Sequence, residues 1–197
     1  MTILLKLSQL IDWLTERVGK GAFWLVLIMT IISAGNAVVR FTFNYSSNGL
    51  LEIQWYLFAA IFLLSAPYTL QKNEHVRIDV LSGKLSPRGH AVIDIIGSLF
   101  FLLPMVVLVL YLSIPLVAES IKISEMSANA GGLIRWPVKI LLPIGFALLA
   151  MQGVSELIKR IAFLMGMIDD PNNKDKGPSA EEELAAAIAA AKAKEAK

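Results

Sequence analysis

The chain has 197 residues, of which 56% are hydrophobic and 17% charged, and its mean hydropathy is +0.63. This balance lies far outside the range of soluble domains and indicates a membrane protein. The absence of cysteine excludes disulfides, thiolate metal sites and thiol nucleophiles. A net charge of +2, with basic residues scattered along the chain, argues against a nucleic-acid-binding surface.

Residues 1–20 predict an amphipathic helix, because large apolar side chains recur every three or four residues from Ile3 to Val18. The other side of this helix carries polar residues: Lys6, Gln9, Asp12, Glu16 and Arg17. Such a helix either lies in the membrane interface or packs its apolar face against another subunit, and the pattern fits both interpretations.

Four apolar runs follow, each long enough to cross a hydrocarbon core of about 30 Å as a helix. They lie at about residues 21–39, 53–70, 95–117 and 140–158. Ser86 and Pro87, a capping residue followed by proline, predict the start of the third helix. The predicted fold class is therefore an all-α integral membrane protein, with one four-helix transmembrane domain over residues 21–165.

The remaining residues, 166–197, form a polar tail rich in alanine, glutamate and lysine. The tail has few large apolar side chains, so we interpret it as solvated and partly helical. A docking segment is the alternative.

The distribution of lysine and arginine predicts that both termini are cytoplasmic. Four of the 18 basic residues fall in or beside the first and third loops: Arg40, Lys122, Arg135 and Lys139. The other fourteen fall in the N-terminal segment, the second loop and the C-terminal segment. Because basic residues are preferentially retained in the cytoplasm, these three segments are expected to lie inside.

The polar residues near the spans do not form a recognisable active site. Glu156 has Lys159 and Arg160 three and four residues away, which predicts a surface ion pair rather than a proton carrier. His75 and Asp79 would supply only two metal ligands, so no metal site is predicted. The sequence contains no known catalytic or nucleotide-binding motif and no paired broken helices for a substrate site at the bilayer midplane, so neither an enzyme nor a self-contained pump is expected.

The second loop contains the charged stretch NEHVRIDVL, from Asn73 to Leu81. Its charged residues alternate with Val76, Ile78 and Val80, so one face can enter the lipid boundary or a partner while the other stays in water. Two interpretations remain open: a satisfied polar turn, or a charged latch that holds this end of the helices against another subunit.

Three segments together resemble the small membrane subunit (DctQ type) of tripartite ATP-independent periplasmic (TRAP) transporters. They are EIQWY from Glu52 to Tyr56, HVRIDVL from His75 to Leu81, and the long stretch from Asn129 to Ile161 that contains RWPVK. The resemblance covers about residues 10–165. One departure is Ser65-Ala66-Pro67, where the proline brings the straightness of the second helix into question.

This resemblance implies a scaffold subunit of a sodium-coupled secondary transporter that imports an organic acid anion, such as a 2-oxo acid or another carboxylate. Its partners would be a large (M) membrane subunit, a periplasmic solute-binding protein and membrane lipid. The large subunit would hold the substrate and the sodium ions, so no cofactor is expected in this chain. The location implied is the inner membrane of a bacterium or an archaeon.

The same resemblance suggests which residues have structural or subunit-contact roles. These candidates are Glu52, Trp55, His75, Arg77, Asp79, Arg135 and Trp136. The competing interpretation is a self-sufficient exporter or channel made of oligomerised four-helix units, which would require a functional acid within a span. Glu52 and Glu156 both fall at span ends, which favours the scaffold.

Overall fold

The computed structural model describes residues 2–45, 47–73 and 86–171 of the chain. Within these ranges every regular element is helical, apart from one isolated antiparallel bridge between Met126 and Ile134. Four continuous helical stretches are long and apolar enough to cross a membrane, which confirms the all-α fold and the four predicted spans. The tail beyond residue 171 and the charged residues 74–81 of the second loop lie outside the described ranges.

The first stretch, α1, is one unbroken helix from Thr2 to Phe43. Its 42 residues measure about 63 Å at 1.5 Å per residue, twice the thickness of a hydrocarbon core. The predicted amphipathic segment therefore continues directly into the first span, with no turn at residue 20. Ile3 and Leu10 of the apolar side are exposed, whereas the polar Ser8 and Thr15 are buried.

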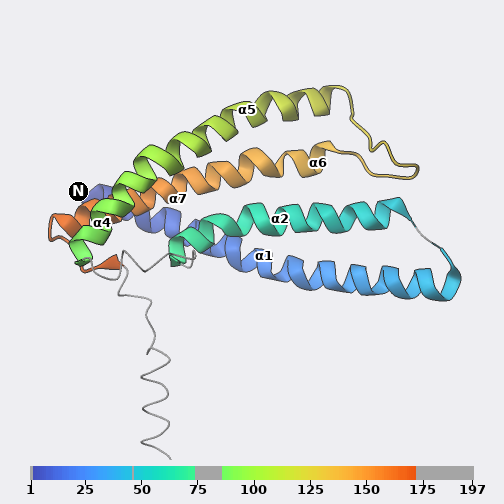
Figure 1. Cartoon of the computed structure of the whole chain (residues 1–197), viewed down its shortest axis with the longest axis horizontal. Helices are drawn as coiled ribbons and strands as arrows, with labels where there is room; N and C mark the ends of the chain where they lie inside the picture. Colours follow the sequence, from blue (N-terminus) through green and yellow to red (C-terminus); the bar gives the residue numbers. More distant parts are fainter. Residues whose placement is uncertain (1, 46, 74–85, 172–197) are drawn as a thin grey trace, which may run out of the picture.

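Helix α2, from Asn48 to Lys72, runs antiparallel to α1 and packs along it (Figure 1). It remains helical through Pro67, so the proline does not end it. Asn73 stops the helix by adopting the left-handed conformation, with φ 56°, and its N–H donates to the carbonyl of Leu70.

The third stretch consists of α4 (Pro87–Gly97), a five-residue π-helix, η1 (Ser98–Leu102), and α5 (Leu103–Lys122). The Ser86 hydroxyl accepts a hydrogen bond from Gly89 N–H, which confirms the predicted helix start at Ser86 and Pro87. Pro104 lies two residues after the end of η1, and proline removes a backbone donor that an α-helix would use. The wider π turn accommodates that loss without ending the helix, which curves along its length in Figure 1.

The last stretch combines the short α6 (Trp136–Lys139) with α7 (Leu141–Leu164). Helix α7 is central, because it packs against α1, α2, α4 and α5. In Figure 1 the helices lie across the view in the order α5, α7, α2, α1. The arrangement has two ends: the hairpin end, where α1 ends, α2 begins and loop 123–135 joins α5 to α6, and the terminal end, where α1 begins and α7 finishes.

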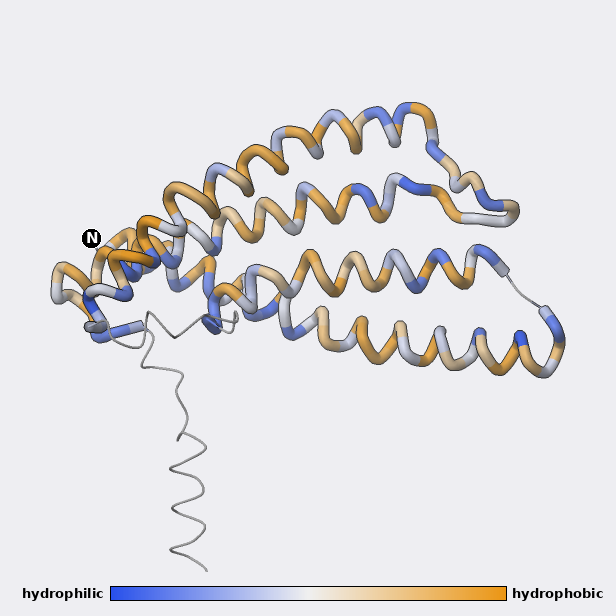
Figure 2. The backbone as a smooth tube through the Cα atoms, viewed as in Figure 1, coloured by the Kyte–Doolittle hydropathy of each residue, from blue (hydrophilic) through white to orange (hydrophobic). Residues whose placement is uncertain are grey.

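The helices are packed through small and polar residues rather than through large apolar ones. A Cβ at Gly145 of α7 would lie 2.8 Å from Leu63 Cβ and 2.9 Å from the Leu63 carbonyl oxygen of α2. A Cβ at Gly19 of α1 would lie 2.6 Å from Cβ and Cγ of Tyr68 of α2. Most long apolar side chains are exposed instead, and Figure 2 shows apolar residues along the helices and polar ones concentrated near their ends. This is the expected arrangement in lipid, where close backbone approach and polar contacts hold helices together.

Candidate functional site: two polar clusters at opposite ends of the helices

Two groups of polar side chains connect segments far apart in the sequence. The hairpin-end cluster consists of Glu52, Ser127, Asn129, Arg135 and the Leu133 backbone. The terminal-end cluster consists of Ser8, Asp12, Gln71, Asp94, Gln152, Ser155, Glu156, Lys159 and Arg160. From Glu52 to Gln71 the chain of α2 rises about 29 Å, so the clusters are separated by about one hydrocarbon core.

Glu52 is the centre of the hairpin-end cluster, and its side chain is almost fully buried, with 1% exposed. Its Oε2 accepts a hydrogen bond from Leu133 N–H at 2.7 Å, and its Oε1 accepts one from Asn129 Nδ2 at 2.9 Å. The Ser127 hydroxyl donates to the same Oε1. One carboxylate from the first turns of α2 therefore binds three donors of the loop between α5 and α6.

Gly132 makes this close approach possible. A Cβ at that position would lie 2.5 Å from Ser127 Cβ and 2.9 Å from Glu52 Oε1, so no other residue fits without displacing one of them. The neighbouring Gly131 has φ 71°, a conformation that favours glycine. Arg135 Nη2 donates to Ser127 Oγ at 3.2 Å, and the Tyr56 hydroxyl donates to the Ile134 carbonyl at 3.0 Å.

The same loop contains an ion pair between Glu125 and Lys139, each about a quarter to a third exposed. The hydrogen bond from the Lys139 ammonium lowers the pKa of the Glu125 carboxyl. Backbone bonds complete the loop, with Arg135 N–H donating to the Glu125 carbonyl at 2.7 Å. These contacts fix loop 123–135 as an ordered surface at the hairpin end.

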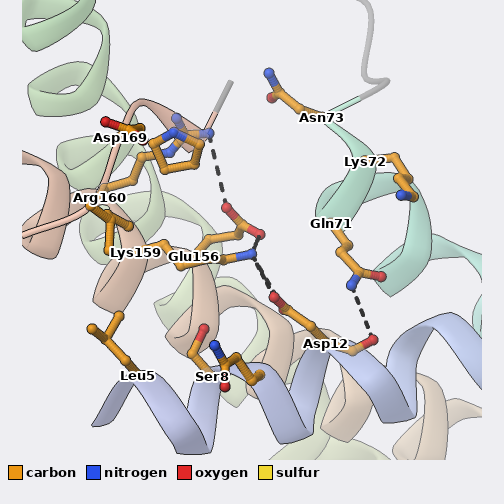
Figure 3. Close-up of a pocket in the computed structure, with 13 residues that line it drawn as sticks. Leu5, Ser8, Asp12, Gln71, Lys72, Asn73, Glu156, Lys159, Arg160 and Asp169 are labelled. Atoms are coloured by element: carbon orange, nitrogen blue, oxygen red, sulfur yellow. Dashed lines mark hydrogen bonds and ion pairs between the residues drawn. The ribbon is translucent and has the colours of Figure 1, made fainter. Parts of the chain in front are cut away.

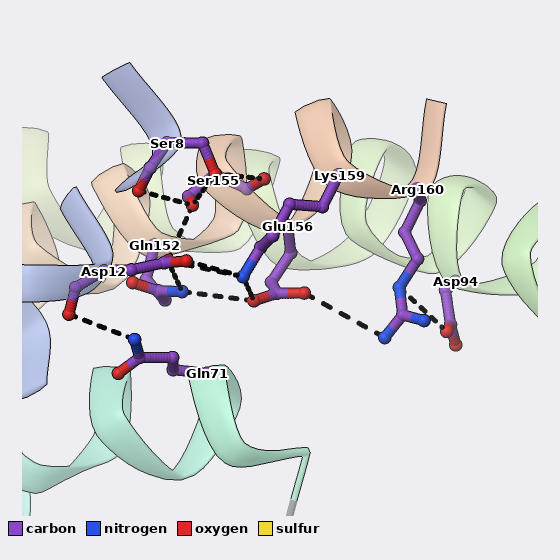
Figure 4. A network of polar contacts seen from close by, with 9 residues as sticks. All are labelled: Ser8, Asp12, Gln71, Asp94, Gln152, Ser155, Glu156, Lys159 and Arg160. Carbon is purple, nitrogen blue, oxygen red and sulfur yellow. Dashed lines mark hydrogen bonds and ion pairs between the residues drawn. The ribbon is translucent and has the colours of Figure 1, made fainter. Parts of the chain in front are cut away.

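The terminal-end cluster begins with Asp12 of α1, which contacts α7 (Figure 4). Asp12 Oδ1 accepts hydrogen bonds from Gln152 Nε2 at 2.9 Å and Ser155 Oγ at 2.8 Å. Lys159 Nζ lies 3.1 Å from Asp12 Oδ2. The Asp12 backbone also takes part, because its carbonyl accepts from Gln71 Nε2 of α2 at 3.0 Å.

Glu156 and Arg160 extend the cluster towards α4. Glu156 Oε1 lies 2.5 Å from Lys159 Nζ, and Glu156 Oε2 lies 3.9 Å from Arg160 Nη2. Arg160 Nε is 3.4 Å from Asp94 Oδ2 of α4, so charged and polar contacts link α1, α2, α4 and α7. The predicted ion pair of Glu156 is confirmed, but its predicted surface position is wrong, because Glu156 is 7% exposed. Helix α7 buries it against α1 and α4, where Asp12 and Asp94 supply further partners for the cations.

A cavity of about 430 Å³ opens beside this cluster, between the start of α1, the end of α2 and the end of α7 (Figure 3). Its wall contains both acids and bases together with Gln71 and a few apolar residues such as Leu5 and Ile168. The cavity therefore offers hydrogen-bonding and charged groups next to a polar network that is already formed.

Of the seven predicted contact residues, the structure describes four and brings two of them together. Glu52 and Arg135 meet in the hairpin-end cluster, through Ser127. Trp55 lies outside the cluster with 60% of its surface exposed, and Trp136 begins α6 and is half-buried. The other three predicted residues, His75, Arg77 and Asp79, lie outside the described ranges.

Sequence reasoning missed most of the terminal-end cluster. Asp12 was expected on the water-facing side of the first helix, and Gln152 was not expected to form part of a site, yet Gln152 is fully buried. A signal was present: Gln152, Ser155, Glu156 and Lys159 share one face of α7 at three- and four-residue spacing. In a membrane helix a polar face points towards protein rather than lipid, so such a face predicts a helix contact.

The arrangement is suited to holding helices and a loop in place. Among the described residues no group of three histidine, aspartate or glutamate side chains could hold a metal ion. In the terminal-end cluster Lys159 and Arg160 of α7 each pair with Glu156 of the same helix and with an acid of another helix, Asp12 of α1 or Asp94 of α4. Such contacts make a structural network.

Comparison with known proteins assigns the family. The family model described as "Tripartite ATP-independent periplasmic transporters, DctQ component" matches residues 11–163, which contain the hairpin-end cluster, the terminal-end cluster apart from Ser8, and most of the four helical stretches. A Haemophilus influenzae protein named "Putative TRAP transporter small permease protein" is 33% identical over 79 residues, 40% of this chain and 49% of that protein. That match spans about half the length of the relative. No solved structure matches the chain.

The family match runs from residue 11 within α1 to residue 163, one residue before the end of α7, and agrees with the four apolar helices. The chain is therefore a membrane protein of the DctQ family, the small permease component of TRAP transporters.

Proposed function

We propose that this chain is the non-catalytic scaffold subunit of a sodium-coupled TRAP transporter that imports an organic acid anion. A large membrane subunit binds the sodium ions and the substrate, and a periplasmic solute-binding protein delivers the substrate to it. The small subunit supplies a fixed set of helices against which the large subunit is held. The family match over residues 11–163 carries this proposal.

The distribution of polar groups supports a scaffold role. The charged residues of the described helices gather near the two ends, and the long side chains between them, such as Phe58, Phe62 and Leu108, are apolar and exposed. An apolar surface of this length suits contact with lipid and with another membrane subunit. Rigid polar clusters at both ends would keep the helices in one arrangement during transport.

The orientation proposed here places the terminal end in the cytoplasm and the hairpin end in the periplasm. Its support is the excess of basic residues in the segments of the terminal end, fourteen against four. Loop 123–135 would then face the solute-binding protein, with Arg135 and Trp136 close to that surface. Single cysteines introduced at Ser124 and at Lys6 test this, because the chain has no native cysteine. An impermeant maleimide applied to intact cells should label only the first; labelling of Lys6→Cys alone would reverse the orientation.

The decisive experiment is purification of the tagged chain from its native membrane in mild detergent, followed by intact mass analysis and uptake measurements. Recovery of a larger hydrophobic partner, with uptake that requires both chains, is the expected result. Uptake by this chain alone in liposomes would refute the scaffold assignment and support the self-sufficient exporter or channel. Uptake that persists without sodium would refute sodium as the coupling ion and would leave the scaffold role intact.

A further inference from the structure

The charges in the wall of the terminal-end cavity cancel. Its cations are Lys72, Lys159 and Arg160, and its acids are Asp12, Glu156 and Asp169. The formal charge of the wall is therefore zero, with both signs within one cavity of about 430 Å³. Electrostatic complementarity favours a ligand that also carries both charges over a simple anion or a simple cation.

The position of the cavity is that of lipid headgroups. Gln71 lies about 29 Å along α2 from the buried Glu52, close to the thickness of a hydrocarbon core, and the helix ends one residue later. Lys72 follows Gln71 in the cavity wall, and basic residues at this depth commonly contact headgroups. The spacing of the two ends places the cavity at headgroup depth in either orientation of the chain.

The hydrogen bonds show which kind of group is missing. Gln71 Nε2 donates to the Asp12 carbonyl, so the amide orientation is fixed and Oε1 must point the other way. That Oε1 is buried and accepts no hydrogen bond. Gln152 repeats the pattern: its Nε2 donates to two carboxylates, and its buried Oε1 has no donor. Of the two glutamines only Gln71 lines the cavity, so a partner for its Oε1 there must donate.

We propose that this cavity binds the headgroup of a phosphatidylethanolamine-type lipid. Its primary ammonium carries three N–H donors, which match the Gln71 Oε1 acceptor and the carboxylates of Asp12 and Glu156. Its phosphate lies on the side of Lys72 and Lys159. Leu5 and Ile168 of the wall provide apolar surface for the glycerol region. Phosphatidylcholine has the same charges but no N–H donor, and is therefore the matched comparison.

The test uses the full-length chain in nanodiscs of phosphatidylcholine doped with one lipid at a time, and counts retained lipids by native mass spectrometry. The dopants are phosphatidylethanolamine and phosphatidylglycerol with the acyl chains of the host lipid. We expect phosphatidylethanolamine to be retained about tenfold more strongly than the other two, the difference expected from one hydrogen bond to a charged group. Equal retention of all three lipids, or preference for phosphatidylglycerol, would overturn the proposal.

Two variants of Gln71 test the acceptor itself. Gln71→Leu should reduce the preference for phosphatidylethanolamine over phosphatidylcholine about tenfold. Gln71→Glu keeps an acceptor at this position and should preserve that preference. Gln54→Leu, the same change at the other end of α2, serves as control and should leave the preference unchanged. If Gln71→Leu retained phosphatidylethanolamine as strongly as the wild type, or if both Gln71 variants lost the same share of that retention, the Gln71 acceptor would not bind the lipid.

Discussion

At the hairpin end one buried carboxylate binds three donors of a single loop, whereas at the terminal end carboxylates and cations from several helices bind one another. All three donors bind the carboxylate of one residue, Glu52. Lys159 has two carboxylates, Asp12 and Glu156, and Arg160 also has two, Asp94 and Glu156. The hairpin end thus depends on one residue, and the terminal end distributes its stability over several.

The largest effect is expected from Glu52→Ala. The substitution leaves the Leu133 N–H, the Asn129 amide and the Ser127 hydroxyl without their acceptor, which should lower the free energy of unfolding by about 4 kcal/mol. Equilibrium unfolding in mixed detergent micelles measures this. Glu52→Gln retains one acceptor oxygen and should lose less; a Glu52→Ala protein as stable as the wild type would mean that the loop is held by other contacts.

Redundancy at the terminal end predicts strong non-additivity. Asp12→Asn and Glu156→Gln should each cost about 1 kcal/mol, because Lys159 keeps one carboxylate in either variant. The double variant leaves this half-buried ammonium without an acidic partner and should cost about 3 kcal/mol. A double-mutant cycle provides the measurement. Strict additivity would show that the two carboxylates do not share Lys159.

A smaller effect is expected from Gly132→Ala, which adds one methyl group against Ser127 and Glu52. Such overpacking should lower the free energy of unfolding by about 2 kcal/mol and disorder loop 123–135. Hydrogen exchange of the loop amides would report the local change. Gly97→Ala is the matched control, because a Cβ there meets no atom within 4 Å; similar exchange in both variants would contradict the steric argument.

The smallest effect concerns the Glu125–Lys139 pair. Because folding lowers the pKa of the Glu125 carboxyl, the pair stabilises the protein fully above the ordinary pKa of glutamate. That contribution is lost as the pH falls through the lowered folded-state pKa. The thermal midpoint of the wild type should therefore exceed that of Glu125→Gln at neutral pH, and the difference between the two midpoints should shrink as the pH falls through the lowered pKa of Glu125. If the difference between the two thermal midpoints did not change with pH, the effect of the substitution would come from packing and not from the ion pair.

Several parts of the structure could be predicted from local sequence. The four spans follow from runs of apolar residues, and the start of α4 follows from Ser86 and Pro87, whose capping needs only neighbouring residues. The length of α1 could not be predicted, because nothing in the local pattern distinguishes a continuous helix from two helices joined near residue 20. Glu52 and Arg135 were predicted as contact residues, but their meeting through Ser127 depends on how the loop folds back.

By itself, the sequence determined the membrane environment, the number of spans and the resemblance to the DctQ family, because hydropathy and short motifs are properties of contiguous residues. Only the tertiary structure decided which polar residues meet. Asp12 and Lys159 are 147 residues apart, and their contact requires α1 to pack on α7. In lipid the polar side of such a helix turns towards protein, and its partner is set by packing between helices that local sequence does not encode.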